Sequence, residues 1–210
     1  MTIFWEWKTN VHPSAAFRWD DRGAMRAFAA EVGFGMLFLT TPDGPRVAHV
    51  PFVFLDDDRL AFHLARGNAI TKHLDSSEAL FVINGPDGYI SPDWYGIDDQ
   101  VPTWNYVALE LQGVARKMDQ AALIAQADAL SLNQEARLAP KLVWTRDKMG
   151  PERFEAMLGG ITGFEMEVTA WRSTVKLGQN KSAEVRNAAA DGAEAAGNRG
   201  LAHLMRNLPT

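Results

Sequence analysis

The 210-residue chain contains no cysteine, so it can form neither disulfide bonds nor thiolate metal sites. It also lacks any run approaching the roughly 20 apolar residues that a membrane-spanning helix needs. Its first ten residues, MTIFWEWKTN, have no basic region followed by an apolar run, so they do not resemble a signal peptide. These absences predict a cytoplasmic protein that does not enter a membrane.

The chain has no excess of basic residues, because its formal net charge is −5. Neither a basic stripe nor a helix-turn-helix pattern is present, so direct DNA binding is not expected. The phosphate-binding loops of nucleotide enzymes and the serine elbow of hydrolases are also missing. His49 and His63 fall on neighbouring predicted strands, but a third ligand is not evident, and we expect no metal site.

Hydrophobic periodicity predicts an antiparallel meander with helices around it. The expected strands are 35–40, 46–55, 59–64, 79–84, 103–117 and 161–171. The expected helices are 22–32, 69–74, 119 to about 133, and about 151 to 158, and a long loop is expected at 85–101. The fold class is therefore mainly β with flanking helices (α+β), as a closed or nearly closed antiparallel barrel. We expect the barrel domain at 1–175 and an alanine-rich helical extension at 176–210, with two weak helices separated by Gly197.

The segment FHLARGNAITKHL, residues 62–74, is the sharpest local feature. A strand ends, a short loop follows, and Asn68 is placed to cap a helix. Helix N-termini attract anions, and Arg66 could hold a phosphate with two hydrogen bonds. Thr71 and Lys72 would add a hydroxyl group and a positive charge one turn later. The alternative is an ordinary capped helix with a surface arginine.

Two further segments carry candidate binding groups. GPDGYISPDWYG (85–96) and VPTWNY (101–106) bring several aromatic rings close together, including Trp104, beside the amide of Asn105. Such rings suit a flat aromatic cofactor, or they pack the barrel end or a dimer contact. VKLGQNKS (175–182) supplies Lys176, Gln179 and Asn180 after a strand. By pattern alone, VKLGQNKS is better explained as a polar turn before a helix.

Taken in order, these segments resemble the PaiB family of FMN-binding negative transcriptional regulators. The resemblance spans nearly the whole chain and is carried by HPSAAFRWDD, HVPF, HLARGNA, GPDGYISPDWY, VPTWNY, GITGFEMEV and KLGQNKS. The family reads KLSQN where this chain has Gly178, so a hydrogen bond from a serine hydroxyl at that position is lost.

The resemblance implies a split barrel similar to pyridoxamine phosphate oxidase, which forms a homodimer with two FMN sites between its subunits. By position, it assigns four strand residues to the border of the isoalloxazine ring: His49, Val50, His63 and Leu64. It assigns the phosphate to Arg66, Asn68, Thr71 and Lys72. It also assigns Trp104, Asn105, Lys176, Gln179 and Asn180 to the neighbourhood of the ring, from either subunit.

Two functions are consistent with these features. One is an FMN-dependent negative transcriptional regulator or sensor, which would respond to flavin or to a small-molecule effector. The alternative is an FMN-dependent oxidoreductase or flavin reductase acting on a small-molecule substrate, in which the flavin carries the redox chemistry. The sequence assigns no catalytic residue for the second function.

Overall fold

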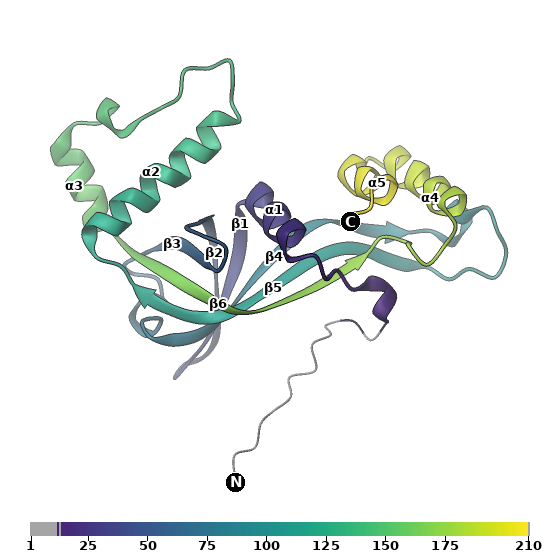
Figure 1. Ribbon diagram of the computed structural model, residues 1–210, viewed down its shortest axis with the longest axis horizontal. Helices are drawn as coiled ribbons and strands as arrows, with labels where there is room; N and C mark the ends of the chain where they lie inside the picture. The colour runs from purple at the N-terminus through teal and green to yellow at the C-terminus, as the bar shows by residue number, and fades with distance from the viewer. Residues whose placement is uncertain (1–11, 13, 210) are drawn as a thin grey trace, which may run out of the picture. The chain divides into compact units, whose positions relative to one another are not determined.

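The computed structural model describes residue 12 and residues 14–209 of the chain, so MTIFWEWKTN lies outside the described residues. Figure 1 shows the helices and strands of the chain. The strands are β1 (Phe34–Thr41), β2 (Gly44–Phe54), β3 (Arg59–Ala65), β4 (Ser77–Ile90), β5 (Thr103–Lys117) and β6 (Ile161–Lys176). The α-helices are α1 (Arg22–Val32), α2 (Gln120–Ala136), α3 (Pro151–Gly159), α4 (Ala183–Ala195) and α5 (Arg199–Arg206). Short 3₁₀ turns are η1 (Ala15–Phe17), η2 (Thr71–His73), η3 (Pro92–Tyr95) and η4 (Arg146–Lys148).

The six strands close into one antiparallel barrel in the order β1-β2-β3-β6-β5-β4. β1 and β2 form a hairpin with Thr41 opposite Gly44, and β3 returns along β2 with Phe62 opposite Phe52. β6 then pairs with β3, although about a hundred residues separate them in the sequence. This architecture confirms the predicted fold class.

The chain divides into two compact units. The first unit comprises the described parts of Met1–Phe28, Asn84–Leu109 and Arg172–Thr210. The second unit comprises Ala29–Ile83 and Glu110–Trp171.

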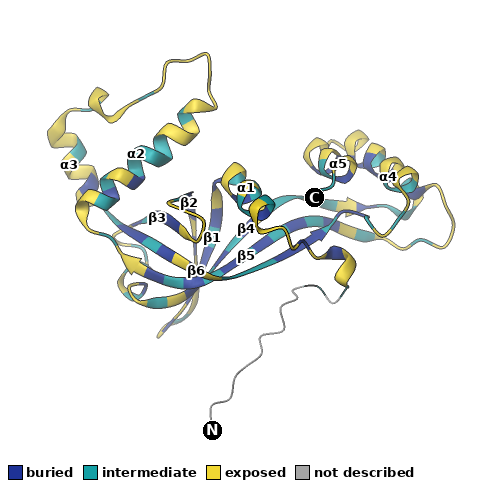
Figure 2. Cartoon of the chain, in the orientation of Figure 1, coloured by how far each residue is buried: buried dark blue, intermediate teal, exposed yellow. Residues whose placement is uncertain are grey.

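The core of the second unit is a cluster of phenylalanine rings inside the barrel. The ring centroids of Phe62 and Phe81 are 5.7 Å apart, and those of Phe62 and Phe164 are 6.0 Å apart. All three side chains are fully buried. Because side chains alternate along a strand, these inward rings leave the intervening positions on the outer face. Figure 2 shows this alternation as successive buried and exposed bands along the strands.

Helix α2 covers part of the outer face of the second unit. It begins at the predicted cap, because the carboxylate of Asp119 accepts a hydrogen bond from the backbone N–H of Ala122 at 2.8 Å. Its Leu123 packs against Gly163 of β6, where a Cβ atom would lie 3.0 Å from the leucine side chain. The missing side chain at Gly163 therefore allows the helix to approach the sheet closely.

Helices α4 and α5 pack together within the first unit (Figure 1). The buried face of α4 is made of alanines, and α5 contributes Leu201, Ala202 and Met205. Gly192 of α4 lies so close to Trp94 of η3 that an added Cβ atom would be 2.4 Å from the indole ring. The two helices predicted after Ser182 are thus present, separated as expected at Gly197.

Two predicted boundaries were wrong. β4 continues through Gly85 to Ile90, so the expected long loop begins only at residue 91 and contains η3. β6 likewise continues past Trp171 to Lys176. Residues 85–90 contain glycine and proline, and residues 172–176 are mostly polar; both stretches extend as strands because each lies beside β5 in the barrel.

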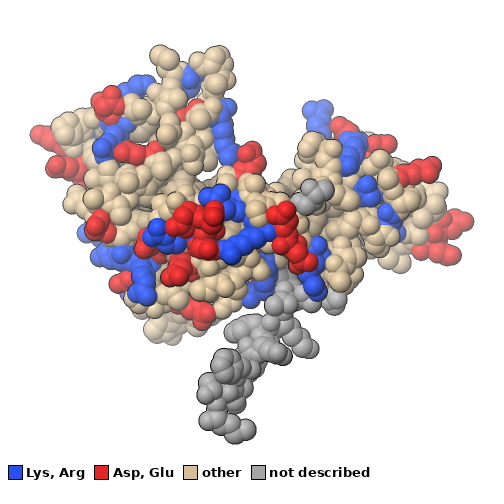
Figure 3. Space-filling view, viewed as in Figure 1, with Lys and Arg blue, Asp and Glu red and all other residues tan. Residues whose placement is uncertain are grey.

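In the described part of the chain, no helix has the length and apolar character required to cross a membrane. On the face that Figure 3 shows, Lys and Arg side chains are intermingled with Asp and Glu side chains, and neither sign dominates. That face therefore carries no broad positive patch.

Candidate functional site

A cavity of about 710 Å³ lies in the second unit and is called here the large cavity. It contains three of the predicted phosphate residues, Arg66, Thr71 and Lys72. Its other lining residues are Asp75, Lys117, Met118, Asp119, Gln120, Leu123, Glu155, Leu158, Gly159, Ile161, Thr162, Gly163 and Phe164. The volume falls within the range of roughly 300–1,000 Å³ that is usual for cofactor sites.

Positive charge in the large cavity is available to a ligand. Within the described residues, none of the cations Arg66, Lys72 and Lys117 has an ion-pair partner. Two of the three carboxylates are already engaged by the backbone: Asp75 accepts from the N–H of Lys117 at 2.9 Å, and Asp119 caps α2. The third, Glu155, is exposed. The lining therefore carries three cations without an ion-pair partner among the described residues, together with three carboxylates, two of which backbone N–H groups hold in place.

The expected helix after Asn68 is wrong. Only the three-residue turn η2 forms there, and it begins at Thr71. Asn68 accepts a hydrogen bond from the N–H of Ile70 at 3.0 Å, which folds the loop locally but starts no regular helix. The helix-dipole argument for anion binding at this point therefore fails, and side-chain charge has to replace it.

Thr71 and Arg66 are held by the backbone of the loop. The Thr71 hydroxyl donates to the carbonyl oxygen of Ala65 at 2.9 Å, so its lone pairs, and not its proton, face other partners. The backbone N–H of Arg66 donates to Gly160 at 2.8 Å, while its side chain is exposed. The loop is thus anchored to the start of β6, and the guanidinium group remains free to reach a ligand.

The four predicted ring residues of β2 and β3 do not line the large cavity. The side chains of Val50 and Leu64 are buried in the barrel core at 3% and 2% exposure, so only their backbone can meet a ligand. His49 and His63 belong to the opposite, outer face of the strands. Nδ1 of His63 lies 2.8 Å from Oε1 of Gln126 on α2, so this imidazole already has a protein partner.

A second cavity of about 130 Å³, called here the lysine cavity, lies in the first unit. It brings together three predicted residues from distant segments: Asn105, Lys176 and Asn180. Phe17, Tyr95, Gln100, Val101, Thr103, Gly178 and Lys181 complete its wall. Tyr95 is buried, and this burial raises the pKa of its phenol, which keeps the hydroxyl protonated at neutral pH.

Trp104 and Gln179 lie outside the lysine cavity. Trp104 faces the other side of β5, where its indole N–H donates a hydrogen bond to the carboxylate of Asp87 at 2.8 Å. There Trp104 lines a separate cavity of about 240 Å³. The amide of Gln179 bonds to its own turn, accepting from the N–H of Leu177 at 2.8 Å and donating to the carbonyl of Val175. Gln179 therefore shapes the turn that carries Lys176 and Asn180.

The sequence prediction missed several cavity residues. Lys117 was placed correctly at the end of a strand, but nothing local linked it to the loop at Arg66. Lys181 stands in the polar segment after β6, and the sequence pattern assigns it to no site. Tyr95 is one of several aromatic residues in 85–106, and the pattern does not distinguish it from the others. Each joins its cavity through strand pairing between distant segments, which no local pattern reports.

Comparison with known proteins identifies the family and the fold. Residues 11–170 match a family model described as "Putative FMN-binding domain". The chain is 31% identical over 159 residues to "Protease synthase and sporulation protein PAI 2" of Bacillus subtilis (strain 168), covering 74% of this chain and 75% of the relative.

Solved structures share the fold at low sequence identity. An FAD and heme binding protein from Mycobacterium smegmatis matches with a TM-score of 0.57 and 17% identity, covering 86% of this chain and 80% of that one. The flavocytochrome Anf3 from Azotobacter vinelandii matches with a TM-score of 0.56 and 16% identity, covering 81% and 74%. The barrel topology, the matched family model and the Bacillus relative together show that this chain belongs to the PaiB family of FMN-binding-type split-barrel proteins.

Proposed function

We propose that the protein binds FMN and holds its phosphate in the large cavity, between Arg66, Lys72 and Lys117. The observation that supports this proposal is the gathering of three unpaired cations in one cavity of about 710 Å³. Guanidinium and ammonium groups are the usual side-chain partners of phosphate.

The residues of the large cavity fit both ends of the cofactor. The phosphate meets the cations, and the apolar side chains of Leu123, Leu158 and Ile161 offer a dry wall for the less polar part of the molecule. Backbone N–H groups hold the carboxylates of Asp75 and Asp119, although both keep their negative charge. When bound, FMN supplies one- and two-electron redox chemistry, and the chain binds and orients it.

We further propose that the protein works as a homodimer that pairs through the first unit. Exposed apolar side chains of the first unit support an interface: Tyr89 is 49% exposed, Trp104 52% and Val101 72%. Large exposed aromatic groups are typical of surfaces that pair with another chain. Light scattering of the purified protein will give the mass of the assembly, and a monomer would contradict this part of the proposal.

The relative's name refers to protease synthesis and sporulation, and we propose a regulatory role for this chain as well. The formal net charge of −5, and the mixed charge on the face in Figure 3, disfavour direct contact with DNA. Regulation would then depend on whether flavin or a small-molecule effector occupies the protein.

Comparing FMN with riboflavin tests the cofactor proposal, because riboflavin differs only by lacking the phosphate. The protein is purified, stripped of bound flavin and titrated with each compound while flavin fluorescence is followed. We expect FMN to bind at least about tenfold more tightly, since a charged hydrogen bond contributes roughly 1.5–3 kcal/mol. Equal affinities would remove the phosphate from the large cavity, and no binding of either compound would refute the proposed function.

A further inference from the structure

The lysine cavity contains two positive charges that the fold does not neutralise. Lys176 and Lys181 both line it, and both are half-buried. Within the described residues, neither has a carboxylate partner at ion-pair distance. Removing ammonium groups from water without a counter-charge is unfavourable, so an anion that enters the cavity gains from both.

Neutral groups hold the two lysines in place. Nζ of Lys176 lies 2.5 Å from the hydroxyl oxygen of Thr103 and 6.0 Å from the ring centroid of Phe17. Nζ of Lys181 donates to the side-chain oxygen of Gln100 and lies 4.4 Å from the ring centroid of Tyr95. Each ammonium group keeps donors that these contacts do not use, because an ammonium group has three. The lysines are therefore positioned but not saturated.

A buried amide adds a directional group to the same cavity. Asn105 is 1% exposed and lines the wall, and among the described residues its side chain has one hydrogen-bond partner, the sulfur of Met205, 3.6 Å from Nδ2. Sulfur is a weak acceptor, so this amide is poorly satisfied by the protein. Gly178 lies beside this amide, and a Cβ atom added there would stand 4.0 Å from Nδ2 of Asn105. Because glycine has no side chain, that position next to the amide is left empty.

The size and composition of the cavity favour a carboxylate over a phosphate. A volume of about 130 Å³ accommodates a small planar group more readily than a nucleotide phosphate with its sugar. No arginine is among its lining residues, whereas the large cavity of the second unit has Arg66. The rings of Phe17 and Tyr95 offer flat apolar surfaces for the stem that carries the acid.

We propose that the lysine cavity binds the carboxylate of a small organic acid, held by Lys176, Lys181 and Asn105. The acid is the substrate or effector class that the protein recognises in addition to its cofactor. This inference is independent of the FMN proposal, because every residue that lines the lysine cavity belongs to the first unit and none lines the large cavity.

The test uses a matched pair of probes, benzoate and its neutral analogue benzamide, on the full-length protein. Binding is followed by ligand-observed NMR and by calorimetry at low ionic strength. We expect saturable binding of benzoate and binding of benzamide weaker by about tenfold or more, the effect of losing a charged hydrogen bond. Equal binding of the two probes would overturn the proposal without the need for any variant.

Variants then assign the site. Lys176→Met and Lys181→Met should each weaken benzoate binding by about tenfold. Lys148→Met is the matched control, because Lys148 is exposed on the second unit and touches neither cavity. Unchanged benzoate affinity in both cavity variants, with circular dichroism confirming that they fold, would refute the assignment.

Two competitors distinguish the possible sources of the anion. Inorganic phosphate should displace benzoate only weakly, and stronger binding of phosphate than of benzoate would refute the choice of a carboxylate. FMN added to saturation should leave benzoate binding in place. Displacement by FMN would show that the lysines serve the cofactor itself and would overturn this inference, whereas a failure to bind FMN would affect only the proposed function.

Discussion

Nδ1 of His63 on β3 and Oε1 of Gln126 on α2 lie 2.8 Å apart. Gln126 is 1% exposed, and its Nε2 has no partner among the described residues. The pair joins α2 to the outer face of the barrel at one of the strand positions where the family resemblance puts the flavin ring. A single hydrogen bond therefore links the position of α2 to His63, which the family resemblance assigns to the flavin ring.

This pair predicts an asymmetric effect of mutation. His63→Ala leaves the buried amide of Gln126 without its partner, and we expect a loss of about 1–3 kcal/mol in the free energy of unfolding. Gln126→Leu also removes the unpartnered Nε2, so it should cost less, about 1 kcal/mol or below. Urea denaturation of both variants and of the double variant measures the coupling. A larger loss for Gln126→Leu than for His63→Ala would contradict the proposed arrangement.

Arg66 is expected to contribute directly to flavin binding. Arg66→Ala should weaken FMN binding by about 1.5–3 kcal/mol, because a charged hydrogen bond to the phosphate is lost. The control is Arg46→Ala, which removes an exposed arginine whose guanidinium, among the described residues, donates only to the carbonyl of Pro45. Titration of wild type, Arg66→Ala and Arg46→Ala with FMN, followed by flavin fluorescence, measures the three affinities. Equal FMN affinity of Arg66→Ala and wild type would exclude Arg66 from the site.

Gly192 is expected to resist substitution, although it stands in a helix. Replacing a helical glycine with alanine usually stabilises a helix by up to about 1 kcal/mol. Here the new Cβ atom would meet the indole of Trp94 at 2.4 Å, so Gly192→Ala should destabilise the protein. Thermal unfolding of Gly192→Ala, Trp94→Ala and the double variant tests this contact. The alanine at position 192 should be better tolerated once the indole is absent, and the contact is refuted if it is not.

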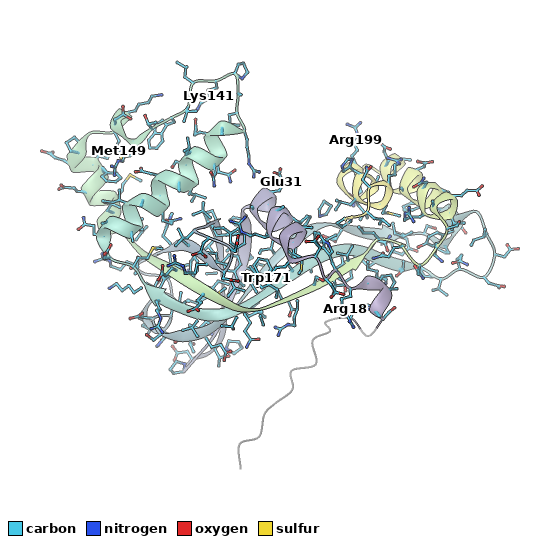
Figure 4. The ribbon with its side chains drawn as sticks, viewed as in Figure 1. Arg18, Glu31, Lys141, Met149, Trp171 and Arg199 are labelled. Atoms are coloured by element: carbon cyan, nitrogen blue, oxygen red, sulfur yellow. The ribbon has the colours of Figure 1, made fainter. Side chains whose placement is uncertain are left out.

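The segment between α2 and α3 should loosen in acid. Glu135 accepts hydrogen bonds from Lys141, which lies on this segment in Figure 4, and from the backbone N–H of Trp144. These bonds, that of Lys141 first, lower the pKa of the Glu135 carboxyl below its ordinary value. A carboxyl with a lowered folded-state pKa stabilises the protein above its unfolded-state pKa, and this contribution is lost as pH falls through the folded-state pKa.

Limited proteolysis of residues 137–150 at pH values from neutral to acid measures this loosening. Cleavage should increase below the ordinary glutamate pKa in the wild type, and Glu135→Gln should already be cleaved faster at neutral pH. Glu152→Gln serves as the control, because that exposed carboxylate accepts no hydrogen bond from the described residues. A pH profile identical in Glu135→Gln and wild type would rule out this role of Glu135.

Local patterns predicted most elements of this protein because the decisive signals are short-range. The apolar spacing of 22–32 predicted α1 at its observed bounds, and Thr103–Lys117 was predicted with both ends correct. Asp119 was identified as the start of a helix, and it does cap α2. A capping carboxylate and an alternating strand depend on residues within a few positions of one another, so the sequence reports them directly.

The errors occur where distant segments decide the local structure. The stretch after Asn68 has helix-compatible residues, yet it forms only η2, because its loop is bonded to Gly160 at the start of β6. β4 passes through Gly85 and Pro86 as a strand, because the barrel provides its partners. In both places tertiary hydrogen bonds outweigh a weak local preference.

By itself, the sequence determined the class of fold, the family and the residue types able to bind anions. Only the tertiary structure decided which of those residues meet. It placed Arg66, Lys72 and Lys117 around one cavity and Asn105, Lys176 and Lys181 around another. It also buried the side chains of Val50 and Leu64 in the core, and the amide of Gln179 is hydrogen-bonded to the backbone of the turn on which it lies. The physical reason is that a binding site needs side chains at set distances in space, and strand pairing between remote segments sets those distances.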